Sequence, residues 1–328
     1  MSKIIYILLV FVVLFTGCSS KKYYEPEDTQ SHKVKIKDTE SIIIDYNADG
    51  ATLENNKYIS TAGMSDLALV DGYKFLNNSN GIILASNETG YLYMNDNASI
   101  TIMEFEKNVI SATISGNLIA LGFIDNSIAL YNIETKKTVF KEYLKVSVLN
   151  DIRIANPIFL NTVILYPTLD GKISVVSKDS KTVVKTINID PESKVNNVIF
   201  LKPIGDTLIA ATSKKLFSFT DGKVKLHDLD IKSVAINNQN VFVATLEGKL
   251  LKYDYELNLL KSKKFKYAKF HTIGYASYLY ALESQGYIIR LDDTFNEVKI
   301  FDFSFDEEEK AMIIDDRLYF EDKYILLK

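Results

Sequence analysis

Short apolar runs separated by polar turns dominate the chain from Lys33 to its C-terminus. The runs are rich in β-branched and aromatic residues, and Asn, Asp and Gly stand between them, which is typical of strands and turns. Helical periodicity is nearly absent. The best helical stretch, Asp306–Met312, is only a turn or two long. The pattern therefore predicts an all-β fold.

One β-hairpin recurs along the chain. Its clearest copy is Val241–Tyr253, in which two apolar runs flank a turn at Glu247-Gly248. A period of about 40 residues built from short strands indicates a β-propeller. Seven hairpins of this kind follow one another: Ile82–Tyr93, Leu118–Tyr131, Val163–Val176, Leu208–Phe219, Val241–Tyr253, Tyr278–Leu291 and Leu318–Leu327.

Two further strands lie between one hairpin and the next, so each repeat supplies one four-stranded antiparallel blade. Counting in this way gives roughly 32 strands, or eight blades of four. The last blade lacks an outer strand, and the first predicted strand, Lys33–Asp38, has no blade of its own. Pairing of these two ends would close the ring and remove exposed edges. A seven-bladed ring with an extra N-terminal hairpin is the alternative.

The N-terminus contains a targeting signal. Lys3 precedes the apolar run Ile4–Phe15, and Thr16-Gly17 leads into Cys18, the only cysteine of the chain. The run is short for a membrane span and suits a signal peptide. The arrangement resembles a bacterial lipoprotein signal, which implies cleavage before Cys18 and lipidation of its thiol. The alternatives are an ordinary signal peptide and an uncleaved anchor.

The predicted boundaries follow from this signal. Residues 1–17 form the signal peptide, residues 18–32 carry the lipid and a flexible polar tether, and residues 33–328 form the propeller. Ser19 resembles the sorting residue of outer-membrane lipoproteins. The expected location is the outer membrane, on its periplasmic side or at the cell surface.

The charged residues exclude several function classes. The formal net charge is −4, which argues against a nucleic-acid partner, because phosphate binding needs a clustered basic surface. Arginine occurs three times and histidine three times, and no Ser-His-Asp spacing, phosphate-binding glycine loop or zinc motif is present. We therefore expect a protein that is not an enzyme.

The hairpins end in Tyr-Asn or Tyr-Asp, with a Glu two residues later and a third apolar strand soon after. Leu118–Lys141 and Val241–Lys264 show this pattern, which resembles the PQQ-type propeller repeat. Together with the lipoprotein signal, the chain looks like the BamB-like propeller lipoproteins of the outer-membrane β-barrel assembly machinery. The chain departs from the family repeat by having no Trp. It also has no pair of cysteines, so it lacks the residues that hold a quinone in the related enzymes, and we expect no cofactor.

One turn has the beginning of a calcium loop. Asp45, Asn47 and Asp49 alternate and Gly50 follows, which matches the start of such loops, because calcium takes six or more oxygen ligands. The later ligand positions are Leu53 and Asn56, which do not complete the motif. A hairpin turn explains the same residues.

Two further features mark individual blades. Asp306, Glu307, Glu308 and Glu309 form an acidic run between two predicted blades, either a solvated loop or a patch that recognises a basic partner. Pro157 and Pro203 fall in predicted inner strands, where a proline indicates distortion near the central channel.

These observations predict a lipid-anchored scaffold of the cell envelope that binds other proteins through the loops of a rigid propeller. The family resemblance implies a role in outer-membrane β-barrel assembly. The alternative is a periplasmic or surface module that binds a glycan, an ion or a host protein.

Overall fold

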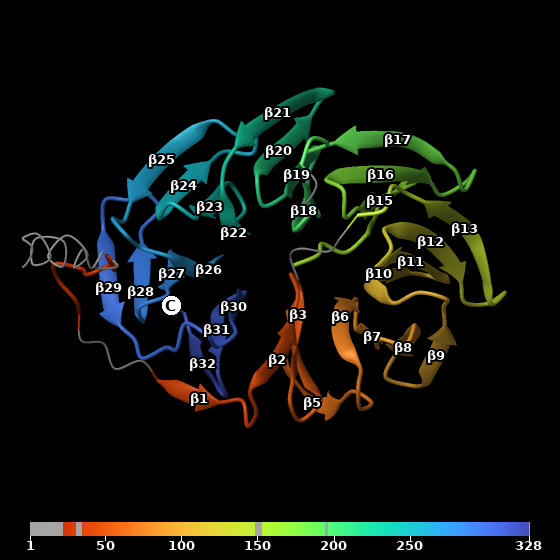
Figure 1. Ribbon diagram of the computed structural model, residues 1–328, viewed down its shortest axis with the longest axis horizontal. Coiled ribbons are helices and arrows are strands. Elements are labelled where there is room, and N and C mark those ends of the chain that lie inside the picture. The colour runs from red at the N-terminus through yellow and green to blue at the C-terminus, as the bar shows by residue number, and fades with distance from the viewer. Residues whose placement is uncertain (1–21, 31–34, 148–152, 194–195, 328) are drawn as a thin grey trace, which may run out of the picture.

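The computed structural model describes residues 22–30, 35–147, 153–193 and 196–327. Within these ranges every regular element is a strand, and the 32 strands form eight separate four-stranded antiparallel sheets. The sheets stand around a central axis as the blades of a propeller, with first strands such as β18, β22, β26 and β30 nearest the centre (Figure 1). The all-β fold and the eight blades are confirmed, and the seven-bladed alternative is excluded.

Four blades occupy the first half of the ring, each written from its inner to its outer strand. They are blade 1 (β2 Ile43–Tyr46, β3 Gly50–Leu53, β4 Lys57–Ser60, β5 Gly63–Ala68), blade 2 (β6 Lys74–Ser79, β7 Ile82–Ser86, β8 Tyr91–Asn95, β9 Ile100–Glu104), blade 3 (β10 Val109–Ser115, β11 Leu118–Phe123, β12 Ser127–Asn132, β13 Lys137–Tyr143) and blade 4 (β14 Ile158–Phe159, β15 Val163–Pro167, β16 Lys172–Ser177, β17 Val183–Asn188).

The second half of the ring ends with the blade that joins the two ends of the chain. These blades are blade 5 (β18 Phe200–Ile204, β19 Thr207–Ala211, β20 Lys215–Thr220, β21 Lys223–Asp228), blade 6 (β22 Ile231–Ile236, β23 Val241–Thr245, β24 Lys249–Tyr253, β25 Leu259–Lys264), blade 7 (β26 Phe270–Tyr275, β27 Leu279–Glu283, β28 Tyr287–Leu291, β29 Val298–Asp302) and blade 8 (β30 Ala311–Ile314, β31 Arg317–Phe320, β32 Lys323–Leu326, β1 Ile36–Asp38).

Blade 8 closes the ring as the sequence predicts. Strand β1 pairs antiparallel with β32, with Ile36 opposite Ile325 and Asp38 opposite Lys323. The first strand of the propeller thus becomes the outer strand of the last blade. This pairing ties the two ends of the domain together and covers the edge that β32 would otherwise expose.

Burial follows the position of a strand within its blade. The second strands β19, β23 and β27 are buried at every residue, because neighbouring blades cover both of their faces. The outer strand β25 is exposed at nearly every position, and it carries the lysine-rich sequence LLKSKK. Side chains from adjacent blades fill the core between them, as Phe242 of blade 6 and Ile273 of blade 7 do.

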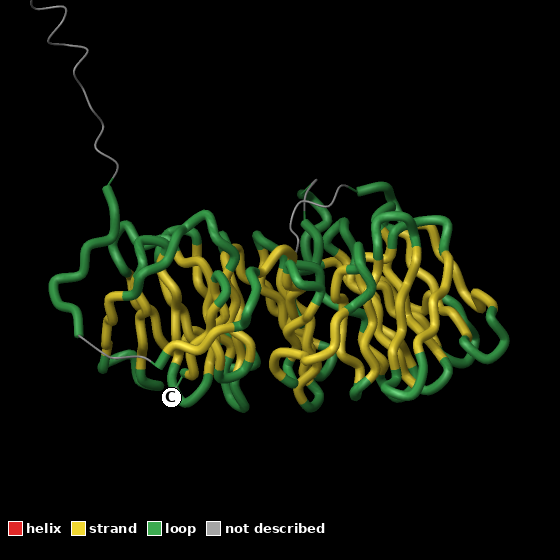
Figure 2. The backbone as a smooth tube through the Cα atoms, turned by 90° about the horizontal axis from the view of Figure 1, so that it is seen from below, coloured by secondary structure: helices red, strands yellow, loops and turns green. Residues whose placement is uncertain are grey.

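The disc has two faces with different connections (Figure 2). We call one the loop face: it carries the connections between blades and the turn between the second and third strands of each blade. We call the other the turn face: it carries the tight turns between first and second strands and between third and fourth strands. The C-terminal end of the described chain lies on the turn face.

Glycines show how the loop face is built. The backbone N–H of Phe303, just after β29, donates to the carbonyl of Gly286 at 2.7 Å, and Phe265 donates to Gly248 at 2.9 Å. Both glycines have positive φ, and a Cβ atom on Gly286 would lie 2.3 Å from the Phe303 carbonyl oxygen. The glycine of the recurring hairpin is therefore required where the connection between blades crosses over the turn.

Two local predictions are corrected. Asp306–Met312 is not helical: the N–H of Glu309 closes a single turn on the Asp306 carbonyl at 3.0 Å, and the chain then enters β30. The predicted inner strand that contains Pro157 is reduced to the two residues of β14. Pro157 immediately precedes β14 and has no N–H for a ladder hydrogen bond, so the pairing begins only at Ile158.

Candidate functional site

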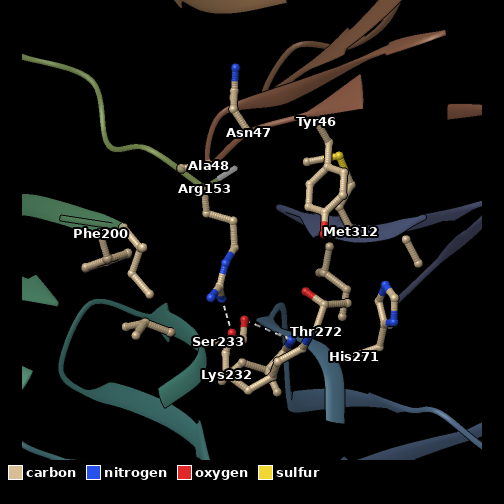
Figure 3. Close-up of a pocket in the computed structure, with 15 residues that line it drawn as sticks. Tyr46, Asn47, Ala48, Arg153, Phe200, Lys232, Ser233, His271, Thr272 and Met312 are labelled. Carbon is tan, nitrogen blue, oxygen red and sulfur yellow. Dashed lines mark hydrogen bonds between the residues drawn. The ribbon is translucent and has the colours of Figure 1, made fainter. Parts of the chain in front are cut away.

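The inner strands surround a central channel that holds two cavities. The cavity toward the loop face is about 140 Å³ and is lined by Arg153, Lys232, His271 and Tyr46, among others (Figure 3). The Arg153 guanidinium donates to the Lys232 backbone carbonyl, and the Ile273 N–H donates to the Ser233 hydroxyl at 3.3 Å. The first contact joins the connection before blade 4 to blade 6. The second contact joins blade 6 to blade 7.

His271 lies in this cavity with one ring nitrogen that has no hydrogen-bond partner among the described residues. Its Nε2 atom is buried and makes no hydrogen bond, and the ring meets Phe305 edge-on at 5.2 Å between centroids. Burial lowers the pKa of His271 to about 4, and the positive charge of Lys232 adds to this effect. The imidazole is therefore neutral at physiological pH, which favours a packing role over a cationic one.

The cavity toward the turn face is larger and polar. It measures about 570 Å³ and is lined by Asn77, Asn78, Thr113, Lys202 and Asp315, among others. A cavity of this size and lining could hold a small polar molecule. Amide and hydroxyl groups from the ends of the inner strands line it together with apolar side chains such as Ile114 and Leu201.

Asn156 lines the larger cavity. Its amide nitrogen donates to the Asp49 carboxylate at 2.6 Å and to the Leu76 carbonyl at 3.1 Å, and its oxygen accepts the Ala112 N–H at 2.9 Å. One side chain from blade 4 thus joins blades 1, 2 and 3. Burial raises the pKa of Asp49, and the Asn156 hydrogen bond and the Lys202 charge oppose that rise.

The three residues of the calcium candidate have separate contacts. The Asn47 oxygen accepts the N–H groups of Asp49 and Gly50 at 2.8 and 3.0 Å, and its amide donates to the Phe75 and Leu76 carbonyls. Asp49 binds Asn156 in the channel. Burial raises the pKa of Asp45, against the charges of Lys74 and Lys310. No three His, Cys, Asp or Glu side chains gather into a metal-holding group within the described ranges.

The acidic run lies on the loop face between blades 7 and 8. Asp306, Glu307 and Glu308 are exposed, whereas Glu309 is half-buried; the Asp306 carboxylate accepts the Glu308 N–H at 3.0 Å. The run belongs to an exposed turn. Burial raises the pKa of the Glu283 carboxyl, and the negative charge of Glu307 makes a smaller contribution in the same direction.

The predicted lipidation site, Cys18, lies outside the described residues, and so does the apolar run before it. Residues 22–30 of the predicted tether are described, and they contact the propeller. Tyr24 is only 7% exposed and meets Phe265 and Tyr287 edge-on at 6.1 and 5.7 Å between centroids. The Gln30 N–H donates to the Ile300 carbonyl of β29 at 2.8 Å. In the part of the chain that the structure describes, no helix is long and apolar enough to span a membrane.

No family model matches the chain. Across 99% of its length it is 28% identical to the plasminogen-binding protein PgbB of Helicobacter pylori strain J99, and the alignment covers 71% of that protein. The PgbB protein of strain 26695 is 27% identical, with the same two coverages. Neither of these two relatives is named as a BamB-like protein, the family that the sequence pattern resembles.

Solved structures support the fold. The crystal structure of BamB from Moraxella catarrhalis matches 91% of this chain and 100% of that one, with a TM-score of 0.66 and 15% identity. The C-terminal WD40 domain of Sif2 matches almost as well, with a TM-score of 0.64, 13% identity, and coverages of 90% and 100%. The BamB-like propeller architecture is thus confirmed. Two structures with such different names fit similarly, so the fold does not select a function.

Sequence reasoning missed the two residues with the most informative contacts, Asn156 and Tyr24. Asn156 was visible only as the neighbour of Pro157, and its partners come from three other blades. Tyr24 stands in a polar segment that resembles a linker. A single aromatic side chain in such a segment was the only available signal of its burial.

Proposed function

We propose that this protein is a lipid-anchored, non-enzymatic scaffold of the cell envelope that binds another protein, and that a host protein is its partner. The observation that carries the proposal is the match to two plasminogen-binding proteins over 99% of the chain. Because the match extends around the whole ring, it includes the loops of both faces. We therefore propose plasminogen as the first partner to test.

The architecture suits this role. Eight blades closed by the β1–β32 pairing hold their turns and loops on a rigid frame, so a partner can bind without paying to order them. The surface carries many lysine and acidic side chains in mixed order, and exposed ion pairs such as Lys74–Glu88 are easily rearranged. Such a surface is compatible with a polar, salt-sensitive protein interface.

The second candidate is the role in outer-membrane β-barrel assembly that the repeat and the lipoprotein signal imply. The structural likeness to BamB supports the fold of this candidate, at 15% identity. The two candidates need different locations: a host protein requires the cell surface, and barrel assembly requires the periplasm. Location therefore separates them.

The test uses the full-length protein purified with its lipid and captured on a sensor surface. We expect plasminogen to bind saturably, more weakly as salt increases, and serum albumin not to bind. Intact cells should lose the protein when an external protease is added. A protein that is protected in intact cells, does not bind plasminogen and co-purifies with a large outer-membrane β-barrel assembly protein would instead establish the second candidate.

Membrane attachment is tested separately with Cys18→Ser. The lipid chains supply the attachment, since each buried CH₂ contributes about 0.8 kcal/mol. We expect the variant to move from the membrane fraction to the soluble fraction while its plasminogen affinity stays unchanged. Unaltered fractionation of Cys18→Ser would contradict the anchor.

A further inference from the structure

The N-terminal segment 22–30 is held against one place on the ring. The Tyr24 ring is buried in the core cluster shared by blades 6 and 7, next to Phe265, and it packs against Tyr287 at the start of β28. Burial raises the pKa of Tyr24 to about 12, with a further contribution from the charge of Glu283. The contacts of Tyr24 are thus with residues at the loop-face end of blades 6 and 7.

The described chain begins on the loop face, as Figure 2 shows. Lys22 lies over the Tyr267 ring at 5.5 Å, and Tyr267 belongs to the connection between blades 6 and 7. Only Ser19, Ser20 and Lys21 separate Lys22 from Cys18. A fully extended chain spans at most about 3.6 Å per residue, so Cys18 lies within about 15 Å of Lys22.

This distance restricts the orientation of a lipidated protein. The opposite ends of a blade are separated by the length of its strands, about 20 Å for five to six residues. Acyl chains on Cys18 would hold that residue at the membrane surface. A point on the loop face near blade 7 is then close to the membrane, and the turn face of the same blades is farther away by the thickness of the disc.

The residues around this point suit a lipid surface. Lys22, Tyr23, Lys266, Tyr267 and Lys269 are all exposed, with Tyr23 at 46% and Tyr267 at 40%. Tyrosine favours the boundary between water and lipid, and lysine extends its charge toward headgroup phosphates. The turn 283–286 lies between this group and the acidic run, because it contacts Lys269 on one side and Phe303 on the other.

We propose that the docked segment 22–30 orients the propeller on the membrane, with the loop face of blades 6 and 7 against the phospholipid headgroups. The contact surface consists of Lys22, Tyr23, Lys266, Tyr267 and Lys269. This inference rests on the lipid anchor of the proposed function. Its consequence is that the turn face, with its polar cavity of about 570 Å³, is directed away from the membrane. A soluble partner meets the turn face, and a membrane-embedded partner meets the acidic run.

Site-directed fluorescence tests this orientation, because a lipidated Cys18 leaves no other thiol in the chain. Gln285→Cys places a label in the loop-face turn of blade 7, and Gln239→Cys places one in a turn-face turn of blade 6; both glutamines are exposed. Full-length lipidated protein is reconstituted in phosphatidylcholine–phosphatidylglycerol vesicles that contain a headgroup quencher. We expect severalfold stronger quenching at position 285 than at position 239.

A second substitution tests the role of the docked segment. Tyr24→Ala removes the buried ring and should reduce quenching at position 285 to the level at position 239. Thr29→Ala, an exposed position in the same segment, should leave the difference intact. Equal quenching at both positions in the unaltered background, or a difference that Tyr24→Ala does not change, would overturn the proposal.

The proposed lipid anchor and the proposed orientation are contradicted by different results. A mass spectrum without acyl chains overturns the anchor and the orientation with it. Lipidated protein with equal quenching overturns the orientation alone. The plasminogen measurement is independent of both, because it uses a sensor surface and a different readout.

Discussion

The two faces of the disc are built differently. On the loop face, a Cβ atom placed on Gly90, Gly171, Gly248 or Gly286 would lie 2.3 to 2.6 Å from a backbone carbonyl of the connection between blades. On the turn face, the same test at Gly81, Gly116, Gly205 and Gly222 finds no atom within 4 Å. All eight glycines have positive φ. The difference shows that the loop face is two layers of chain thick at these positions, whereas these four turns of the other face are uncovered. Gly63, also on the turn face, differs from them, because a Cβ atom there would lie 2.8 Å from the Arg317 guanidinium.

The reason is topological. Each blade must return from its outer strand to the inner strand of the next blade, and this connection passes over the turn between its second and third strands. The turn face has no such crossing. Its turns are therefore free to vary and to contact a partner, and those of the loop face are constrained by packing.

The largest expected effect comes from Gly286→Ala on the loop face. Left-handed backbone costs an alanine about 1–2 kcal/mol, and the close contact with the Phe303 carbonyl adds an overpacking cost of about 1–3 kcal/mol. Together they should lower the free energy of unfolding by about 4 kcal/mol, as measured by urea denaturation.

Gly222→Ala is the matched control on the turn face. It has the same backbone strain without the contact, so we expect a loss of about 1 kcal/mol. Equal losses for Gly222→Ala and Gly286→Ala would contradict the two-layer description of the loop face.

The next effect concerns His271, which lines the loop-face half of the channel. Its folded-state pKa is lowered from 6.5 to about 4. Its contribution to stability is therefore complete above pH 6.5 and is lost as the pH falls toward 4, by about 3 kcal/mol in total. His271→Gln should remove this part of the pH dependence, as measured by denaturation at pH 7 and pH 4. If the unaltered protein and His271→Gln lose the same free energy of unfolding between pH 7 and pH 4, another titrating group is responsible.

A smaller effect is expected at Asn156, which lines the larger cavity and joins three other blades. Asn156→Ala removes three hydrogen bonds and leaves the Asp49 carboxylate and the Ala112 N–H without this partner, which should cost about 2 kcal/mol. Asn238→Ala, at an exposed position of the turn face, should change stability by less than about 0.5 kcal/mol. Similar values for the two variants would mean that Asn156 does not join the blades.

The smallest effect is expected for the acidic run, whose residues lie in a surface turn. Replacing Glu307, Glu308 and Glu309 together by Gln should change the free energy of unfolding by less than about 0.5 kcal/mol. If plasminogen meets the turn face, its binding should also stay the same in a sensor measurement. A large loss of plasminogen affinity would place the partner on the loop face instead.

Much of the fold could be predicted because the same pattern of strands and turns recurs along the sequence. The alternation of apolar strands with turns at Gly248 and Gly286 specifies a blade, and its recurrence favours eight blades over seven. The closing pair was also predictable, since Lys33–Asp38 and the last hairpin each lacked a partner. Errors arose where the repeat is interrupted: at the short β14 and in the turn 306–309, which resembled a helix start.

The candidate site could be predicted only in part. The acidic run and the Asp45–Gly50 turn were recognised from local composition, and the structure shows each of them as a turn. Asn156 and Tyr24 were not recognised, because their contacts join segments far apart in the chain. No local pattern records that the Asn156 amide meets Asp49, or that the Tyr24 ring fits between Phe265 and Tyr287.

The sequence by itself determined the four-stranded blade and the way the ring closes, because short-range alternation and turn chemistry act within one repeat. It favoured eight blades over seven, and the structure decided between them. Only the tertiary structure decided which glycines are covered, which blades Asn156 joins, and where the segment before the propeller attaches. These features depend on pairs of residues from different blades, and their geometry exists only after the ring has formed.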